Sequence, residues 1–186
     1  MTASVLVPER YPHLAQYAAG RPFDQVGVEF LPSEPTRRLG MSRLVLRPGV
    51  VDDAATEFFA WGYCWLLAGA LREATGWPYG LVERQRPDGW EWTHVGVITP
   101  GGRFLDVMGE RDVNGLTALL RLSYDLPTRI RSGGHADLCE AMPMPADTGP
   151  GWWRETLAAP ILLDVVRVFA ATLLNRLPES ARLEVA

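Results

Sequence analysis

Three residues that can perform nucleophilic chemistry occur in the chain in the order Cys64, His94 and Asp106. A cysteine attacks as its thiolate, which a neighbouring imidazolium and the unpaired N–H groups at a helix start both favour. A carboxylate that accepts a hydrogen bond from the imidazole fixes the tautomer of the ring and stabilises its protonated form. The three residues therefore predict a catalytic triad with Cys64 as the nucleophile.

The helix that carries Cys64 is predicted from its apolar residues. Leucine and alanine recur at helical spacing from Cys64 to Ala74, and Thr75-Gly76 supplies a stop signal before Pro78. Because the helix has few polar side chains, we expect it to lie in the core, with its first turn held firmly in place.

His94 and Asp106 are predicted on neighbouring strands. The segments 91–98 and 103–107 read as strands, and Thr99-Pro100-Gly101-Gly102 between them has the composition of a turn. His94 and Asp106 are separated by an even number of residues, so a three-residue turn would place them directly opposite each other on one face. A register change of one residue would place them on opposite faces.

Each residue of the trio also has an interpretation that involves no chemistry. Cys64 could be a small core residue, His94 a hydrogen-bonded histidine within a strand, and Asp106 a turn residue that precedes Gly109. These alternatives are independent of one another, whereas one shared role accounts for all three residues. The triad is therefore the favoured prediction.

The remaining segments predict an α+β protein. We expect the 186 residues to form a single domain. Its parts would be N-terminal strands and loops at 1–50, a catalytic core at 51–110, a loop or lid at 132–151 and a C-terminal helix at 156–178. Further predicted elements are strands at 26–30, 43–47 and 79–84, a loop between the first two of these, and helices at 52–59 and 116–122.

The composition excludes several classes of partner. Apolar residues make up 47% and charged residues 22% of the chain, as in ordinary globular proteins. The formal net charge of -4 gives no basic footprint, so we expect no nucleic-acid partner. Neither a secretory signal nor a long apolar segment is apparent, so we expect a soluble protein without a membrane span. Cys64 and Cys139 fit free thiols in a reducing cytoplasm.

The residues around Cys64 resemble a known family. Gly62-Tyr63-Cys64-Trp65 is similar to the Gly-x-Cys-Trp motif at the nucleophile of papain-like cysteine peptidases. With Ala68, Gly76-Trp77-Pro78, Thr93-His94-Val95 and Leu105-Asp106, the pattern looks more like the bacterial transglutaminase-like branch of that superfamily. The resemblance covers about residues 58–110. It implies a papain-like core, in which a nucleophile helix packs on an antiparallel sheet, with an additional C-terminal helix.

This resemblance also implies a role for each member of the trio. Cys64 would be the nucleophile, His94 the general base and then acid, and Asp106 the orienting residue. Papain-like peptidases have an oxyanion-hole glutamine six residues before the cysteine, whereas this chain has Phe58 there, and their histidine comes far later in the chain. The oxyanion donors would therefore be backbone groups, such as the N–H of Cys64 and a second, unassigned group.

Aromatic residues surround the predicted nucleophile. Their density predicts an aromatic cleft for an apolar or ring-bearing substrate, and the alternative is that several of them fill the core. Trp90, beside the Asp88-Gly89 turn, is expected to be the most exposed. The predicted substrate-binding residues are Trp61, Tyr63, Trp65, Trp90 and Trp92.

The leading functional hypothesis is a cysteine-dependent hydrolase or acyl-transferase that forms a thioester from an amide, with no metal or cofactor. The substrate would be a protein, a peptide or a small amide. Attack by water would give peptidase, amidase or deamidase activity, and attack by an amine would give transglutaminase-type transfer. The alternatives are a papain-like binding module without turnover and a metal-dependent hydrolase that uses His94, His135 and Cys139.

Overall fold

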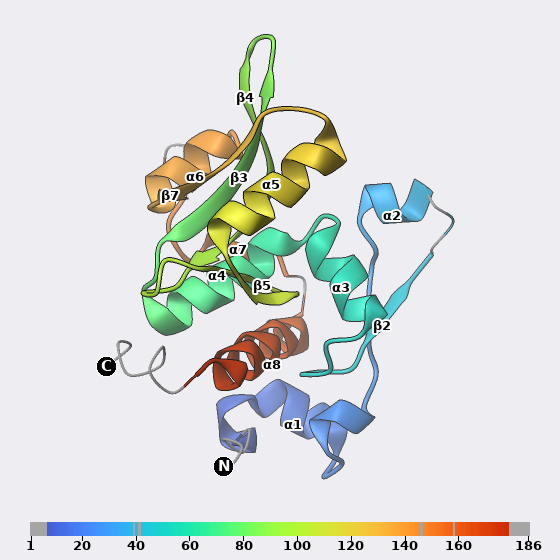
Figure 1. Ribbon diagram of the computed structural model, residues 1–186. Helices are drawn as coiled ribbons and strands as arrows, with labels where there is room; N and C mark the ends of the chain where they lie inside the picture. Colours follow the sequence, from blue (N-terminus) through green and yellow to red (C-terminus); the bar gives the residue numbers. More distant parts are fainter. Residues whose placement is uncertain (1–6, 39, 41, 146, 158, 179–186) are drawn as a thin grey trace.

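The computed structural model of the chain describes residues 7–38, 40, 42–145, 147–157 and 159–178. Its centre is a five-stranded antiparallel sheet in the order β6-β5-β4-β3-β7 (Figure 1). The strands of this sheet are β3 (Tyr79–Arg86), β4 (Gly89–Ile98), β5 (Phe104–Asp106), β6 (Gly109–Arg111) and β7 (Thr128–Gly133).

Helices make up the rest of the fold, together with a separate two-stranded antiparallel sheet of β1 (Val28–Phe30) and β2 (Leu44–Leu46). Short 3₁₀ helices lie at Pro8–Arg10 and Phe23–Gln25. The α-helices are α1 (Pro12–Ala18), α2 (Glu34–Arg38), α3 (Asp53–Ala60), α4 (Cys64–Thr75), α5 (Val113–Tyr124), α6 (His135–Ala141), α7 (Trp152–Glu155) and α8 (Pro160–Arg176).

Helix α4 lies in the main core, as its apolar sequence predicts. It packs on β4 on one side and on α8 on the other, and its residues from Leu66 to Leu71 are all buried. The core continues through Leu81, Val95 and Val97 of the sheet. A helix that is enclosed in this way cannot shift without disturbing the core, so its first turn is a rigid support for a side chain.

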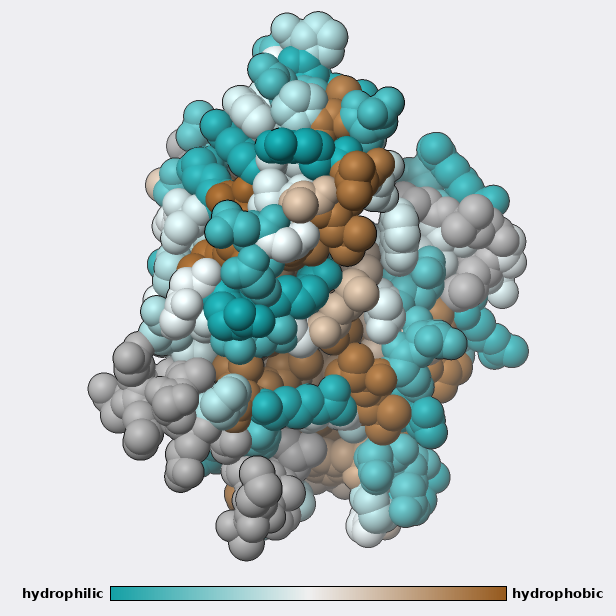
Figure 2. All heavy atoms as spheres, viewed as in Figure 1, coloured by the Kyte–Doolittle hydropathy of each residue, from teal (hydrophilic) through white to brown (hydrophobic). Residues whose placement is uncertain are grey.

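Helix α5 packs with a second, smaller core. Leu116 of this helix packs with Val82 and Phe104 of the sheet. Its Leu119 and Leu122 are exposed, and hydrophobic side chains are visible among hydrophilic ones on the face of the molecule that α5 occupies (Figure 2). The combination of helices and an antiparallel sheet confirms the predicted α+β class.

The N-terminal part joins the main core through α1. Asp164 of α8 is 2% exposed and accepts hydrogen bonds from the backbone N–H groups of His13, at 2.8 Å, and Leu14, at 3.0 Å. These are N–H groups of the first turn of α1, which have no acceptor within their own helix. Asp164 therefore attaches the start of α1 to the N-terminal part of α8.

Several predicted elements are confirmed. The strands at 26–30 and 43–47 appear as the shorter β1 and β2, and the helix at 116–122 appears as the longer α5. The helix at 52–59 appears as α3, where Asp52 accepts a hydrogen bond from the N–H of Ala55 at 3.0 Å. The C-terminal helix starts at Pro160, because proline suits the first helical position. No helix of the described residues is long and apolar enough to cross a membrane.

Two predicted loops contain helices instead. The loop between the N-terminal strands includes α2, and the loop predicted at 132–151 includes the end of β7 and α6. The start of α6 is supported by Asp137, whose carboxylate accepts a hydrogen bond from the N–H of Gly134 at 2.8 Å, and by the burial of Leu138. These helices are too short to produce a visible sequence period, so tertiary contacts decide them.

Candidate active site

Cys64 is the first residue of α4 and is 4% exposed. The turn before it depends on Gly62, whose φ of 137° lies in a region that favours glycine. Ser33 packs against this turn: its hydroxyl donates to the carbonyl oxygen of Trp61 at 2.5 Å, and a Cβ added to Gly62 would lie 2.5 Å from the Cβ of Ser33. The entry to α4 is therefore fixed by the N-terminal segment.

Two backbone donors lie beside the thiol. Among the described residues, the N–H groups of Cys64 and Trp65 donate no hydrogen bond, whereas the N–H of Leu66 already donates to the carbonyl of Tyr63 at 3.1 Å. Unpaired N–H groups at a helix start favour a thiolate and can stabilise a developing oxyanion. Phe58, at the position of the papain-like glutamine, is buried and stacks on the Tyr63 ring, with centroids 4.5 Å apart.

His94 contacts both of the other members of the trio. Its Nε2 donates a hydrogen bond to Oδ2 of Asp106, at 2.9 Å, and the side chain of Cys64 lies close enough to the ring to raise the pKa of His94. Because Nε2 is taken by Asp106, Nδ1 is the ring nitrogen left for the sulfur. The structure therefore brings Cys64, His94 and Asp106 together, with the imidazole in the middle.

The strand register differs from the one expected. The pairs are Val97 with Leu105 and Ile98 with Phe104, so five residues, 99–103, connect β4 to β5 instead of three. If this register is continued, Asp106 falls opposite residue 96, diagonal to His94, and a direct pairing of residues 94 and 106 is wrong. The two side chains still share a face because the shift is an even number of positions.

The charge state of His94 follows from its neighbours. Burial lowers the pKa of His94, but the negative charge of Cys64 and hydrogen bonds to Asp106 and Cys64 outweigh it and raise the pKa to about 10. Burial also raises the pKa of Asp106, but the hydrogen bond to His94 and the charges of His94 and Arg111 hold it below its usual value. At neutral pH the ring is thus an imidazolium beside a carboxylate.

Arg111 is a member of the site that the sequence did not suggest. Its Nη2 donates a hydrogen bond to Oδ2 of Asp106 at 2.5 Å, and the N–H of Met108 donates to Oδ1 at 2.9 Å. The side chain of Asp106 is 5% exposed, and that of Arg111 is 26% exposed. The pairing depends on β6, which is three residues long and is too short for a sequence pattern to reveal it.

The aromatic residues nearest to Cys64 in sequence form a packed wall. Trp65 stacks on Trp152, with ring centroids 4.7 Å apart, and its indole N–H donates to the carbonyl of Gly62 at 3.1 Å. Tyr63 lies between Phe58 and Trp65. The ring of Trp152, which is distant from Cys64 in sequence, completes this wall. Trp61, at the end of α3, is 62% exposed.

The other two predicted aromatic contacts lie elsewhere. Trp90 is on the β3–β4 hairpin, four residues and roughly 13 Å along the strand from His94. The guanidinium of Arg129 covers its ring at 4.1 Å, which leaves it 39% exposed and less exposed than Trp61, contrary to expectation. Trp92 packs against the main core, and its buried Nε1 has no partner among the described residues.

A β-bulge lies directly before His94. β3 pairs Val82 with His94 but Glu83 with Trp92, so Thr93 is an extra residue, and its hydroxyl donates to the carbonyl of Val82 at 3.2 Å. Bulges turn the following side chain and are frequent beside active sites. This bulge separates Trp92, which packs on the main core, from His94, which contacts Asp106.

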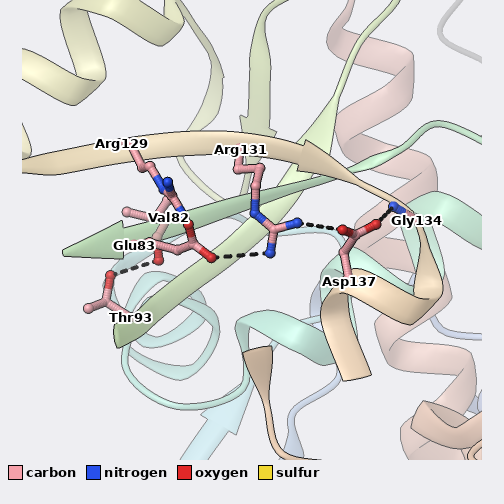
Figure 3. A network of polar contacts seen from close by, with 7 residues as sticks. All are labelled: Val82, Glu83, Thr93, Arg129, Arg131, Gly134 and Asp137. Atoms are coloured by element: carbon pink, nitrogen blue, oxygen red, sulfur yellow. Dashed lines mark hydrogen bonds and ion pairs between the residues drawn. The ribbon is translucent and has the colours of Figure 1, made fainter. Parts of the chain in front are cut away.

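Glu83 connects the bulge to the edge strand β7. Its side chain is 6% exposed and contacts Arg129 at 2.7 Å and Arg131 at 3.2 Å, and Arg131 also contacts Asp137 of α6 at 2.5 Å (Figure 3). The buried charge of Glu83 is therefore compensated by two arginines. The network joins β3, β7 and α6 at the bulged end of the sheet.

His135 and Cys139 form a separate pair on α6. The sulfur of Cys139 lies 3.3 Å from Nε2 of His135, which also contacts the carbonyl of Thr148 at 2.8 Å. Burial raises the pKa of Cys139, which disfavours its thiolate. No group of three or more His, Cys, Asp and Glu side chains suited to a metal ion occurs in the described part of the chain, so His94, His135 and Cys139 do not assemble as a ligand set.

Comparisons of the chain with models of protein families, with curated proteins and with solved structures find no match.

Proposed function

We propose that the protein is a cysteine-dependent hydrolase or acyl-transferase that acts on an amide through a thioester on Cys64. The observation that carries this proposal is the position of the His94 ring, which is hydrogen-bonded to Asp106 and lies close enough to Cys64 for that side chain to raise its pKa. A thiol, an imidazole and a carboxylate in this sequence of contacts supply a nucleophile, a proton carrier and an orienting group.

The first half of the reaction forms the thioester. The Cys64 sulfur attacks the carbonyl carbon of the amide, and the carbonyl electron pair moves onto oxygen. The free N–H groups of Cys64 and Trp65 are the donors available for that oxygen. As the oxyanion collapses and the carbon–nitrogen bond breaks, the His94 imidazolium donates a proton to the leaving amine and becomes neutral.

The second half releases the acyl group. Neutral His94 takes a proton from water, the resulting hydroxide attacks the thioester carbonyl, and the carbon–sulfur bond breaks to return the thiolate. The products are a carboxylic acid and the starting ion pair. If an amine replaces water, the same steps give a new amide. The substrate class remains a protein, a peptide or a small amide, and Tyr63, Trp65 and Trp61 would line its path.

The fold is consistent with the proposed papain-like relationship. A buried helix begins with the cysteine, and an antiparallel sheet packed on that helix carries the histidine and the aspartate. This arrangement supports a papain-like core and, through the short spacing of the trio, its transglutaminase-like branch. The resemblance remains part of the proposal.

The proposal is tested by the alkylation of Cys64 with iodoacetamide at pH 7, quantified by peptide mass spectrometry. Cys139 in the same molecule is the matched control, because burial raises its pKa. We expect Cys64 to react at least about tenfold faster than Cys139, and His94→Ala to remove most of that difference. Equal rates, unchanged by His94→Ala, would contradict the proposal and favour a binding module without turnover.

A second experiment separates hydrolysis from transfer. The wild-type protein and Cys64→Ala are incubated with a panel of acyl p-nitroanilides, with and without dansylcadaverine as a primary amine. We expect a Cys64-dependent release of nitroaniline and an acyl adduct that hydroxylamine removes. Formation of the dansylcadaverine amide would indicate acyl transfer, and its absence alongside turnover would indicate hydrolysis.

A further inference from the structure

Asp106 is buried, and one of its carboxylate oxygens has two partners. Oδ2 contacts both the His94 ring nitrogen, at 2.9 Å, and the Arg111 guanidinium, at 2.5 Å, whereas Oδ1 accepts the N–H of Met108. All of these groups donate to the carboxylate. Asp106 is thus held from both sides, and a rotation that broke the contact to His94 would also break the contact to Arg111.

The β5–β6 hairpin places Arg111 on the same face as Asp106. Arg111 pairs with Phe104, and Asp106 pairs with Gly109, so Arg111 lies two positions from Asp106 on the neighbouring strand. The guanidinium of Arg111 also lies 5.7 Å from the Phe104 ring centroid, and its Nη1 contacts the sulfur of Met108 at 3.7 Å. In the described part of the chain, Asp106 is the only acidic partner of Arg111.

The charges of the site balance only when Arg111 is included. A thiolate on Cys64, an imidazolium on His94 and a carboxylate on Asp106 sum to one negative charge in a largely buried space. Buried charge without compensation is costly, and it is relieved when a group takes up a proton. Arg111 supplies the fourth charge, which makes the group neutral.

We propose that Arg111 is a positioning residue of this site, which keeps the Asp106 carboxylate ionised and oriented toward His94. The inference rests on the proposed role of Cys64 and adds a residue on which the pH range of that role depends. Arg111 acts through Asp106 and does not itself contact the thiol.

The test compares the pH dependence of Cys64 alkylation by iodoacetamide in Arg111→Met, Arg111→Lys and the matched control Arg103→Met. Arg103 is close in sequence and contacts Glu110 at 3.1 Å instead of Asp106. Arg111→Met should move the lower pH limit of fast alkylation upward, on the order of one pH unit, because Asp106 then takes up a proton more easily and no longer supports the His94 imidazolium. Arg111→Lys keeps the charge and should stay close to wild type, as should Arg103→Met.

A background of Asp106→Asn gives a second readout. If Arg111 acts through Asp106, Arg111→Met should have no further effect on the profile in that background. A variant that melts earlier but keeps the wild-type pH limit, or an effect that persists in Asp106→Asn, would overturn the inference. If Arg111→Met does not fold, the Arg111→Lys variant tests the inference. A displaced lower pH limit of alkylation in Arg111→Lys would overturn the inference.

The outcome for the wild-type protein separates the two proposals. If wild-type Cys64 reacts no faster than Cys139, the proposed function fails and the role of Arg111 fails with it. If wild-type Cys64 reacts fast and depends on His94 while Arg111→Met behaves like Arg103→Met, only the inference about Arg111 fails.

Discussion

Cys64, His94 and Asp106 obtain their properties from contact with one another. A buried histidine without a charged neighbour is more easily deprotonated, because burial disfavours its charged form. In this protein the same burial is outweighed by negative charge on two sides, so the pKa of His94 rises to about 10. The imidazolium form of His94 is therefore present at neutral pH and is lost as the pH rises through about 10.

At this scale we predict the titration of His94 in wild type and in Cys64→Ala, followed by NMR of the imidazole nitrogens. Wild-type His94 should remain protonated at pH 8. Cys64→Ala removes the negative charge of the thiolate, and the pKa of His94 should fall. Cys139→Ser is the control and should leave the titration unchanged. An imidazole that titrates near its ordinary value of 6.5 in wild type would contradict the prediction.

The helix α4 and the hairpins β3–β4 and β5–β6 position these residues close to one another. The start of α4 is determined by Gly62 and Ser33, and the direction of His94 is determined by the bulge at Thr93, beside the buried Glu83. Gly62 and Thr93 lie close to Cys64 and His94 in sequence, whereas Ser33 packs against the turn at Gly62 from a distant segment. The position of the reactive groups thus depends on residues that take no part in the proposed reaction.

We predict that Gly62→Ala slows the alkylation of Cys64, because the new Cβ would be strained at a φ of 137° and would overlap Ser33. The expected loss of stability is about 1–3 kcal/mol in urea unfolding. The matched control is Gly76→Ala at the other end of α4, where φ is 74° and no atom lies within 4 Å of the added Cβ. It should cost about 1 kcal/mol and leave the alkylation rate unchanged. Equal effects of both variants on the rate would argue against a role for the turn.

We predict that two glutamates, each in contact with two arginines, differ in how much stability is lost when they are replaced by glutamine. Replacement of Glu83, whose side chain is 6% exposed, by Gln should cost about 1–3 kcal/mol, because the buried carboxylate loses its charged contacts to Arg129 and Arg131. Glu91 is 47% exposed and contacts Arg84 and Arg86, and Glu91→Gln should cost less than about 1 kcal/mol. Chemical denaturation measures both. A Glu83→Gln protein as stable as Glu91→Gln would show that the network does not support the bulge.

At the scale of the whole molecule, α4 is enclosed by the sheet on one side and by α8 on the other, and α8 in turn holds α1. This arrangement separates support of the fold from the chemistry of the site. Asp164 illustrates the separation, since among the described residues its buried carboxyl group accepts hydrogen bonds from the start of α1 and from no residue of the trio. Its role is therefore in stability.

We predict that Asp164→Ala lowers the free energy of unfolding by about 1–3 kcal/mol, because two N–H groups of α1 lose their acceptor. The alkylation rate of Cys64 should not change at temperatures where the variant is folded. Asp53→Ala, at an exposed residue of α3, is the control and should stay within about 0.5 kcal/mol. A slower reaction of Cys64 in Asp164→Ala would show that α1 and the site are coupled.

Much of the local structure could be predicted because it depends on short-range pattern. The apolar spacing and Thr75-Gly76 identify α4, and Asp52 identifies the start of α3. The alternation of side chains along a strand is fixed by the backbone, so the even separation of His94 and Asp106 placed them on one face despite the wrong turn length. The catalytic role of the trio is still a prediction.

The tertiary structure decided the contacts that join distant segments. Arg111 reaches Asp106 only because the short strand β6 pairs with β5, and Glu83 meets Arg129 and Arg131 only because β7 returns to pair with β3. Trp152 completes the aromatic wall beside Cys64 from far along the chain. By itself the sequence determined the residue types, the helix that presents the thiol and the shared face of His94 and Asp106. The partners of those residues required the folded chain, because pairing between distant segments is set by burial and register, which local periodicity does not encode.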